Sequence, residues 1–222
     1  MLSVGVCRSF AAVFLLFSAA TVCAAEPSPA LSPSEEQLIL QTGFERPILQ
    51  IIKEETQSAL HRLRGYDEKG FQIIVRGIVT SVPESRTERL LSALRTRLAP
   101  FGVRAFIVDI NEPIKSDQIG FLKCADQYEI LRVMYTNGNE DDITHEDILE
   151  RMKEWEHKYP FDIVGAEHDW VEIEFKVVPE NVKAFAEEVY DFSPDVVDED
   201  LGTVQELVKD LQATKRLLMW WE

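Results

Sequence analysis

The chain has 222 residues and a formal net charge of −16, with 39 Asp and Glu against 23 Lys and Arg. Such an acidic chain repels phosphate and offers no basic stripe, which argues against nucleic-acid binding. The charge is unevenly distributed, because residues 1–135 hold 15 acidic and 15 basic residues, whereas residues 136–222 hold 24 acidic and 8 basic ones. A neutral half is thus joined to a strongly acidic half, which favours recognition of a partner over chemistry.

The first residues have the layout of a secretory signal peptide. Arg8 precedes an apolar run over Phe10–Val22, and small residues follow at the cleavage position. The run is shorter than a membrane span, and no later segment is long and apolar enough to be one. We therefore predict a signal peptide over residues 1–24, a flexible leader over 25–33, and export to the periplasm or the extracellular space. A lipid anchor at Cys23 is the alternative, which the residues before this cysteine disfavour because they lack the usual lipidation motif.

The neutral half, residues 34–126, shows alternating helix and strand patterns after a helix start at Ser32. The predicted elements are a helix over 46–64, a strand over 71–80, a helix over 87–98, a strand over 103–110, and a loop or short helix over 111–125. The strand, helix and strand in this series form a β-α-β unit, which implies two parallel strands with a right-handed connection.

The acidic half, residues 127–222, continues without a linker. Thr144 and Asp147 have capping-box spacing and predict a helix that ends near Lys158. The remaining predicted elements are strands over 128–135, 161–164, 170–178 and 217–221, and helices over 181–190 and 204–211. The order β-α-β-β-α-α-β is a split β-α-β arrangement with one extra helix. Because strand 128–135 joins the two halves directly, we predict an α+β fold with one mixed sheet, and a last strand covered on both faces.

Neither the cysteines nor the carboxylates suggest a metal or cofactor. Cys124 is the only cysteine outside the predicted signal peptide, so no internal disulfide is expected. A lone cysteine of this kind is more often a buried apolar residue than a nucleophile. The densest carboxylate run, Asp191–Asp200, lacks the spacing of a calcium loop. We predict no metal site and no cofactor.

A set of short motifs in the acidic half resembles a known bacterial family. The motifs are Ile130-Leu131-Arg132, Thr136-Asn137-Gly138, Asp142–Ile148, Lys153-Glu154-Trp155, Asp169–Glu172, Phe192–Asp198, Gly202-Thr203 and Trp220-Trp221-Glu222. Together they resemble the domain of unknown function 4253 family, best over residues 127–222 and extending back to about residue 65. The family has no established activity, so the resemblance implies a fold unit and no reaction.

The chain departs from the family pattern at three places. It has Ser193-Pro194-Asp195 where the pattern has Cys-Pro-Asp, Glu222 where the pattern ends in Asp, and Glu199-Asp200 where the pattern has Gln-Gly. If the family cysteine performed thiol chemistry, Ser193 could not replace it. A structural role would tolerate the exchange.

Trp170 is the aromatic residue whose position is most informative. In the predicted strand it shares a face with Glu172, whereas Val171 and Ile173 alternate onto the core face. A tryptophan on a charged face is either covered by another element or part of a contact surface. We take Asp169, Trp170, Glu172 and Asp195 as candidate partner-binding residues and assign no catalytic residue. Trp220 and Trp221 are predicted to lie in the core.

These patterns lead to three hypotheses about function. The first is a non-catalytic binding module that recognises a cationic protein, as an inhibitor or a toxin-neutralising protein does. The second is a hydrolase that uses Asp169, His168 and Asp195, which would have to converge in space. The third is a protein that binds a small ligand between its two halves, which requires a pocket there. The first is favoured because no catalytic or phosphate-binding motif is present.

Overall fold

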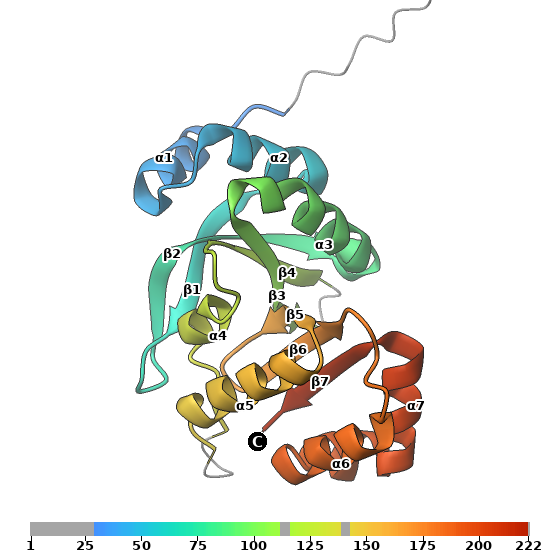
Figure 1. Cartoon of the computed structure of the whole chain (residues 1–222). Helices are drawn as coiled ribbons and strands as arrows, with labels where there is room; N and C mark the ends of the chain where they lie inside the picture. The colour runs from blue at the N-terminus through green and yellow to red at the C-terminus, as the bar shows by residue number, and fades with distance from the viewer. Residues whose placement is uncertain (1–28, 112–115, 139–142, 222) are drawn as a thin grey trace, which may run out of the picture.

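The computed structural model describes residues 29–111, 116–138 and 143–221 (Figure 1). The predicted signal peptide, with Cys23, and the start of the leader lie outside this range. One seven-stranded mixed sheet runs through both halves of the chain in the order β1-β2-β4-β3-β5-β6-β7. The predicted α+β class with a mixed sheet is therefore confirmed.

The strands are β1 (Leu60–Tyr66), β2 (Gln72–Pro83), β3 (Val103–Asn111), β4 (Ser116–Lys123), β5 (Phe161–Ala166), β6 (Trp170–Phe175) and β7 (Arg216–Trp220). The helices are α1 (Pro33–Thr42), α2 (Arg46–Thr56), α3 (Glu84–Leu98), α4 (Glu129–Met134), α5 (His145–Lys158), α6 (Val182–Phe192) and α7 (Val204–Thr214). A short 3-10 helix, η1 (Ala99–Phe101), and a wider π-helix, η3 (Val196–Leu201), complete the described elements. None of the described helices is long and apolar enough to cross a membrane.

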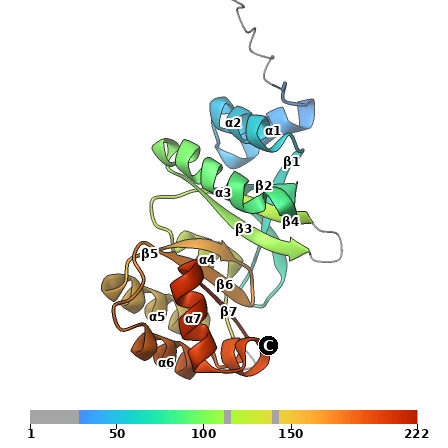
Figure 2. The same cartoon turned by 90° about the vertical axis from the view of Figure 1, so that its right-hand side faces the viewer.

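The helices form two layers that pack on opposite faces of the sheet (Figures 1 and 2). Helices α1, α2 and α3 bury one apolar cluster, which includes Leu90 and Phe121, against β1 to β4. Helices α4 to α7 bury a second cluster, which includes Trp155 and Leu122, mainly against β5 to β7. Consecutive strand residues such as Phe121 and Leu122 enter different clusters because side chains alternate across a strand.

The β-α-β unit of the neutral half is present, but its two strands are not neighbours. Both β2 and β3 pair antiparallel with β4, so they run parallel to each other with β4 between them. The prediction of a loop or short helix over 111–125 is therefore wrong. Gly120 lies within β4, and a glycine makes a strand harder to predict from the sequence. Glycine is required here because a Cβ at this position would lie 2.5 Å from Cγ2 of Val108 and 2.9 Å from Cζ of Phe106.

The helix predicted over 46–64 is too long. Helix α2 ends at Thr56, and Gln57 closes it in the left-handed conformation with its N–H bonded to the Lys53 carbonyl at 2.9 Å. Leu60 and Leu63, which share a stripe on a helix, lie in β1 and enter the two different clusters. An odd separation places them on opposite faces of a strand, and this explains why the spacing of three was misleading.

The strand predicted over 128–135 is wrong, since this segment forms α4. Its buried residues Ile130, Leu131 and Met134 lie on one helical face and reach the second cluster. A helix of six residues is too short for its period to appear in the sequence. The carbonyl oxygen of Val133 would lie 2.1 Å from a Cβ at Gly65, so α4 sits directly on the backbone of β1.

The other predicted elements are present with shifted ends, and α5 begins with the predicted capping box of Thr144 and Asp147. Strand β7, however, is an edge strand covered on one face. Its Leu217 and Met219 are buried, whereas Leu218 is 40% exposed. The prediction that this strand is covered on both faces is therefore wrong. Trp221, just beyond the strand, is buried as predicted, and Trp220 is half-buried against the second cluster.

Candidate functional site

The turn between β5 and β6 carries two of the candidate partner-binding residues. The Glu167 N–H donates to the Trp170 carbonyl at 3.0 Å and closes the turn. Asp169 is exposed, and its carbonyl accepts a hydrogen bond of 3.0 Å from the Trp221 N–H. The Asp169 carboxylate is thus presented at the point where the end of the chain is fastened to the sheet.

Trp170 is half-buried and lies over a glycine of the neighbouring strand. A Cβ at Gly165 would lie 2.7 Å from Cζ3 of the Trp170 ring, so only glycine leaves room for the indole. Trp170 also packs against the first cluster, and it pairs with Trp220 across β6 and β7. One part of the Trp170 ring is therefore covered by Gly165 and the first cluster, and another part is exposed to solvent. Its contact with a partner stays a prediction.

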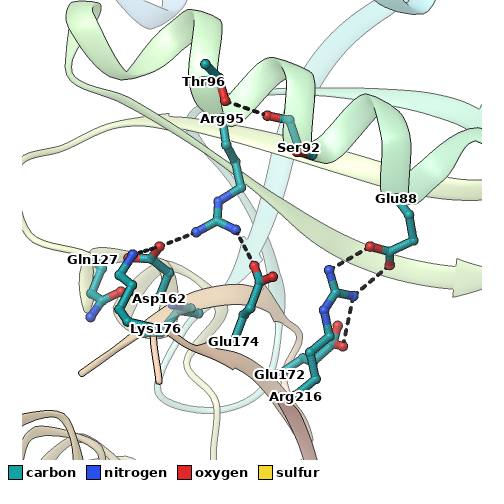
Figure 3. A network of polar contacts seen from close by, with 11 residues as sticks. Glu88, Ser92, Arg95, Thr96, Gln127, Asp162, Glu172, Glu174, Lys176 and Arg216 are labelled. Atoms are coloured by element: carbon teal, nitrogen blue, oxygen red, sulfur yellow. Dashed lines mark hydrogen bonds and ion pairs between the residues drawn. The ribbon is translucent and has the colours of Figure 1, made fainter. Parts of the chain in front are cut away.

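Glu172 lies on the same face but its side chain is only 14% exposed. It pairs with Arg216 at 3.3 Å, and Arg216 forms a second, two-pronged pair with Glu88 of α3 at 2.6 and 2.7 Å (Figure 3). Burial raises the pKa of Glu172 even though the Arg216 guanidinium opposes this shift. This carboxylate is thus committed to contacts within the molecule.

A second arginine makes an equivalent connection between α3 and the acidic half. Arg95 donates to Asp162 of β5 at 2.6 Å and to Glu174 of β6 at 2.8 Å, and Lys176 also pairs with Asp162 (Figure 3). We call the group formed by Glu88, Arg95, Asp162, Glu172, Glu174, Lys176 and Arg216 the charged seam. In the charged seam, three cations from both halves pair with four carboxylates, three on this face of the sheet and one on α3.

Asp195, the fourth candidate, lies far along the chain at the start of η3. It is half-buried and forms no ion pair with the described residues. Two residues earlier, Ser193 is fully buried, and its Oγ donates to the Trp220 carbonyl at 3.1 Å. The position that holds cysteine in the family pattern therefore anchors the last strand, which supports the structural role over thiol chemistry.

The Thr136-Asn137-Gly138 motif meets the β5–β6 turn, which sequence reasoning did not anticipate. Thr136 Oγ1 donates to the Glu167 carbonyl at 2.7 Å, and the Asn137 N–H donates to the His168 carbonyl at 2.8 Å. A Cβ at Gly138 would lie 2.8 Å from Cγ of Trp221. These contacts explain why motifs widely spaced in the sequence occur together. No signal in a single sequence shows that they converge.

His168 is held by aromatic and amide groups. Its ring stacks on Tyr66 with centroids 4.5 Å apart, and Nδ2 of Asn137 lies 3.3 Å from the ring nitrogens. Burial raises the pKa of Tyr66 to about 12, helped by the hydrogen bond from its hydroxyl to Glu167. Within the described residues, no hydrogen bond or ion pair links His168 to the carboxylate of Asp169 or Asp195.

Many of the other carboxylates of residues 136–222 lie on or next to α5, α6 and α7, which we call the outer helical layer. Several are exposed and form no ion pair within the described part of the chain, in contrast to the charged seam. These are Glu146, Glu150, Glu180, Asp191 and Asp210. Across residues 29–111, 116–138 and 143–221, no group of three or more His, Cys, Asp or Glu side chains is placed to hold a metal ion.

Comparison with known proteins relates the acidic half to a family of unknown function. Residues 118–222 match the model of a family described as Domain of unknown function (DUF4253). The match covers the charged seam's β5, β6 and β7 residues, the β5–β6 turn and the motifs that meet it. No curated protein and no solved structure matches the chain.

Proposed function

We propose that this chain, whose residues 118–222 match the DUF4253 family model, is an exported, non-catalytic binding module that recognises a cationic protein. Binding of this chain would cover the functional surface of the partner and so inhibit or neutralise it. Export rests on the signal-peptide pattern of residues 1–24. The observation that carries the proposal is the contrast between two sets of carboxylates, one neutralised within the molecule and one left to solvent.

The outer helical layer is the surface that would meet the partner. Glu146 and Glu150 of α5, Asp191 of α6 and Asp210 of α7 are exposed there and form no ion pair within the described residues, whereas other carboxylates of these helices, such as Glu154 and Glu206, pair with a neighbouring cation. Carboxylates without internal cations keep their full attraction for a basic surface, and complementary charge speeds encounter. Glu172 is withheld from such contact by Arg216, so of the four candidates Asp169 is the one best exposed to a partner.

The hydrolase alternative has less support. A general base needs hydrogen-bond reach to the group that it activates and a second group that orients it. His168 is instead stacked on Tyr66 and lies beside Asn137. No described contact brings the Asp169 or Asp195 carboxylate to its ring.

A capture experiment with matched charge variants tests the proposal. The mature chain is immobilised and exposed to envelope extract of its source at low and at high salt, and retained proteins are identified by mass spectrometry. We expect a basic protein that is retained at low salt and released at high salt, because surface ion pairs are screened. Substitution of Glu146, Glu150 and Asp191 by the corresponding amides should abolish its retention.

The control variant carries Glu68→Gln, Glu84→Gln and Asp67→Asn, which remove the same charge from exposed or half-exposed positions of the neutral half. It should retain the same protein as the wild type. Recovery of no basic protein, or equal loss in both variants, would contradict the proposal.

A further inference from the structure

A cavity of about 550 Å³ lies between the two halves of the chain, with Arg95 in its lining. Its walls come from α3, η1, the start of β3, the segment after β4, and β5. The lining residues are Ser92, Arg95, Thr96, Ala99, Gly102, Val103, Arg104, Ala105, Cys124, Ala125, Asp162 and Ile163. This volume is within the usual range of small-molecule sites.

The charge of the lining is opposite to that of the whole protein. It contains two guanidinium groups, Arg95 and Arg104, and one carboxylate, Asp162. Asp162 already pairs with both Arg95 and Lys176. The lining side chains thus carry one more positive than negative charge in a chain of net charge −16, although Arg95 also pairs with Glu174 and the carboxylates of Asp126 and Glu129 lie close enough to act on Cys124.

Arg104 is the cation that this arrangement leaves without an acid. Its Nη2 donates to the Ala125 carbonyl at 2.9 Å, and Nε is buried without a hydrogen-bond partner within the described residues. It forms no ion pair with the described carboxylates. A guanidinium has five N–H donors in a planar fork that matches a carboxylate. Here it donates to the Ala125 carbonyl and interacts with the neighbouring Cys124 thiol, so it keeps donors for an anionic ligand.

The rest of the lining suits an organic body more than a bare ion. Val103, Ala105 and Ile163, each almost fully buried, contribute small apolar areas to the wall, and the hydroxyl-bearing Ser92 lies on the α3 side. Pockets for small molecules typically combine apolar walls with a few polar groups that fix orientation. The combination indicates a ligand with one anionic head and a short apolar body.

We propose that this cavity binds a small organic carboxylate, and that the Arg104 guanidinium contacts its anionic head. The site lies apart from the outer helical layer, so it is independent of the partner proposed above. A bound ligand in this cavity would contact residues of both halves of the chain.

Cys124 provides a reporter inside the same cavity. It is half-buried and lines the wall next to Arg104. Burial raises the pKa of its thiol, as do the nearby carboxylates of Glu129 and Asp126, while Arg104 opposes this shift. A change in thiol pKa alters reaction with all alkylating reagents alike. The ratio of the rates for an anionic and a neutral reagent therefore reports the local charge of the cavity.

The experiment measures alkylation of Cys124 by iodoacetate and by iodoacetamide in the full chain, with peptide mass spectrometry to separate Cys124 from Cys7 and Cys23. We expect a rate ratio, iodoacetate over iodoacetamide, about fivefold above that of N-acetylcysteine. Arg104→Gln should lower the ratio to that of N-acetylcysteine or below it. Arg97→Gln, which removes the same charge outside the cavity lining, should leave it unchanged.

A second arm tests the ligand class with defined probes. Hexanoate should slow the reaction of Cys124 with iodoacetamide in the wild type but not in Arg104→Gln, whereas uncharged hexanamide should not slow it in either. Protection by inorganic phosphate instead of hexanoate would overturn the carboxylate assignment. A rate ratio equal to that of N-acetylcysteine in the wild type, or unaffected by Arg104→Gln, would overturn the anion site itself.

Discussion

Ser193 shows how one side chain connects a family motif to the end of the chain. Its hydroxyl is buried and satisfies the carbonyl of Trp220, at the last residue of the edge strand β7. Removing one partner of a buried hydrogen bond leaves the other unsatisfied, which costs more than the net value of the bond itself. Ser193 is therefore better explained as the residue that holds β7 in position than as a reactive group.

Ser193→Ala should lower the free energy of unfolding by about 1–2 kcal/mol, because the Trp220 carbonyl loses its donor. Ser193→Cys should lose less, since a thiol is a weak donor of similar shape. Urea titration followed by tryptophan fluorescence measures both. Ser85→Ala, at an exposed position of α3, is the control and should change little. A Ser193→Ala variant as stable as the wild type would show that the bond contributes nothing.

The alternation of charged and apolar residues in β6 could be predicted from the sequence. Whether each charged side chain is exposed or paired within the molecule could not. The pattern correctly placed Trp170 and Glu172 on the face opposite Val171. Whether that face is open depends on Arg216 and on Glu88, 84 residues before Glu172 in the chain. A contact across such a sequence separation leaves no local signal.

At the scale of elements, prediction worked where a period was long enough to be seen. Helices α3 and α5 span several turns, and α5 also has both members of its capping box. The short α4 and the glycine-containing β4 were missed because packing against neighbours decides them. The spacing of three between Leu60 and Leu63 predicts one face of a helix. The same spacing also places two residues on opposite faces of a strand, which is where they lie.

A buried glutamate fastens the first helix to the sheet. Glu35 is 2% exposed, and its carboxylate accepts hydrogen bonds from Lys53 Nζ at 2.7 Å and from the Leu60 N–H at 3.0 Å. The Ser32 N–H also donates to it at 2.7 Å, as part of the capping box. Burial alone would raise its pKa, but these hydrogen bonds outweigh burial and lower the pKa to about 2.

The lowered pKa predicts a pH-dependent contribution to stability. A carboxylate whose pKa is lower in the folded state stabilises the fold above its unfolded pKa of 4.5, and this contribution is lost as the pH falls from 4.5 to about 2. Glu35→Gln should cost on the order of 2–3 kcal/mol at pH 7, and the difference from the wild type should shrink towards pH 2. Urea unfolding at a series of pH values measures it.

The matched control is Glu36→Gln, one residue along the same helix, whose carboxylate forms a partly exposed pair with Arg46. Such surface pairs contribute little, so this variant should lie within about 1 kcal/mol of the wild type. A Glu35→Gln difference that stays constant between pH 7 and pH 2 would contradict the assigned pKa.

At the scale of the whole molecule, the two halves share one sheet rather than forming two domains. The family match begins at residue 118, inside β4, yet both neighbours of β4 lie earlier in the chain. Strands β3 and β5 join the halves through the parallel pair of Ile107 and Gly165. The second apolar cluster also includes Leu63 and Phe106 from the neutral half. These shared contacts predict that the halves unfold together.

The distribution of tryptophan makes this prediction testable, because all four tryptophans lie in the acidic half and, apart from the contact of Trp170 with the first cluster, report the unfolding of that half. Leu49 of α2 is fully buried in the first cluster, far from the family-matched segment in sequence. Leu49→Ala should cost about 2–5 kcal/mol. If the sheet unfolds as one unit, the urea midpoints from tryptophan fluorescence and from far-UV circular dichroism should coincide and fall by the same amount.

Leu40→Ala is the control, since Leu40 of α1 is 90% exposed and its truncation removes almost no buried surface. It should leave both midpoints in place. A Leu49→Ala variant whose fluorescence midpoint is unchanged, while circular dichroism resolves two transitions, would show that the acidic half unfolds independently. The joint shift is the expected outcome because β4 and β3, which complete the sheet beside β5, depend on the helical layer that Leu49 anchors.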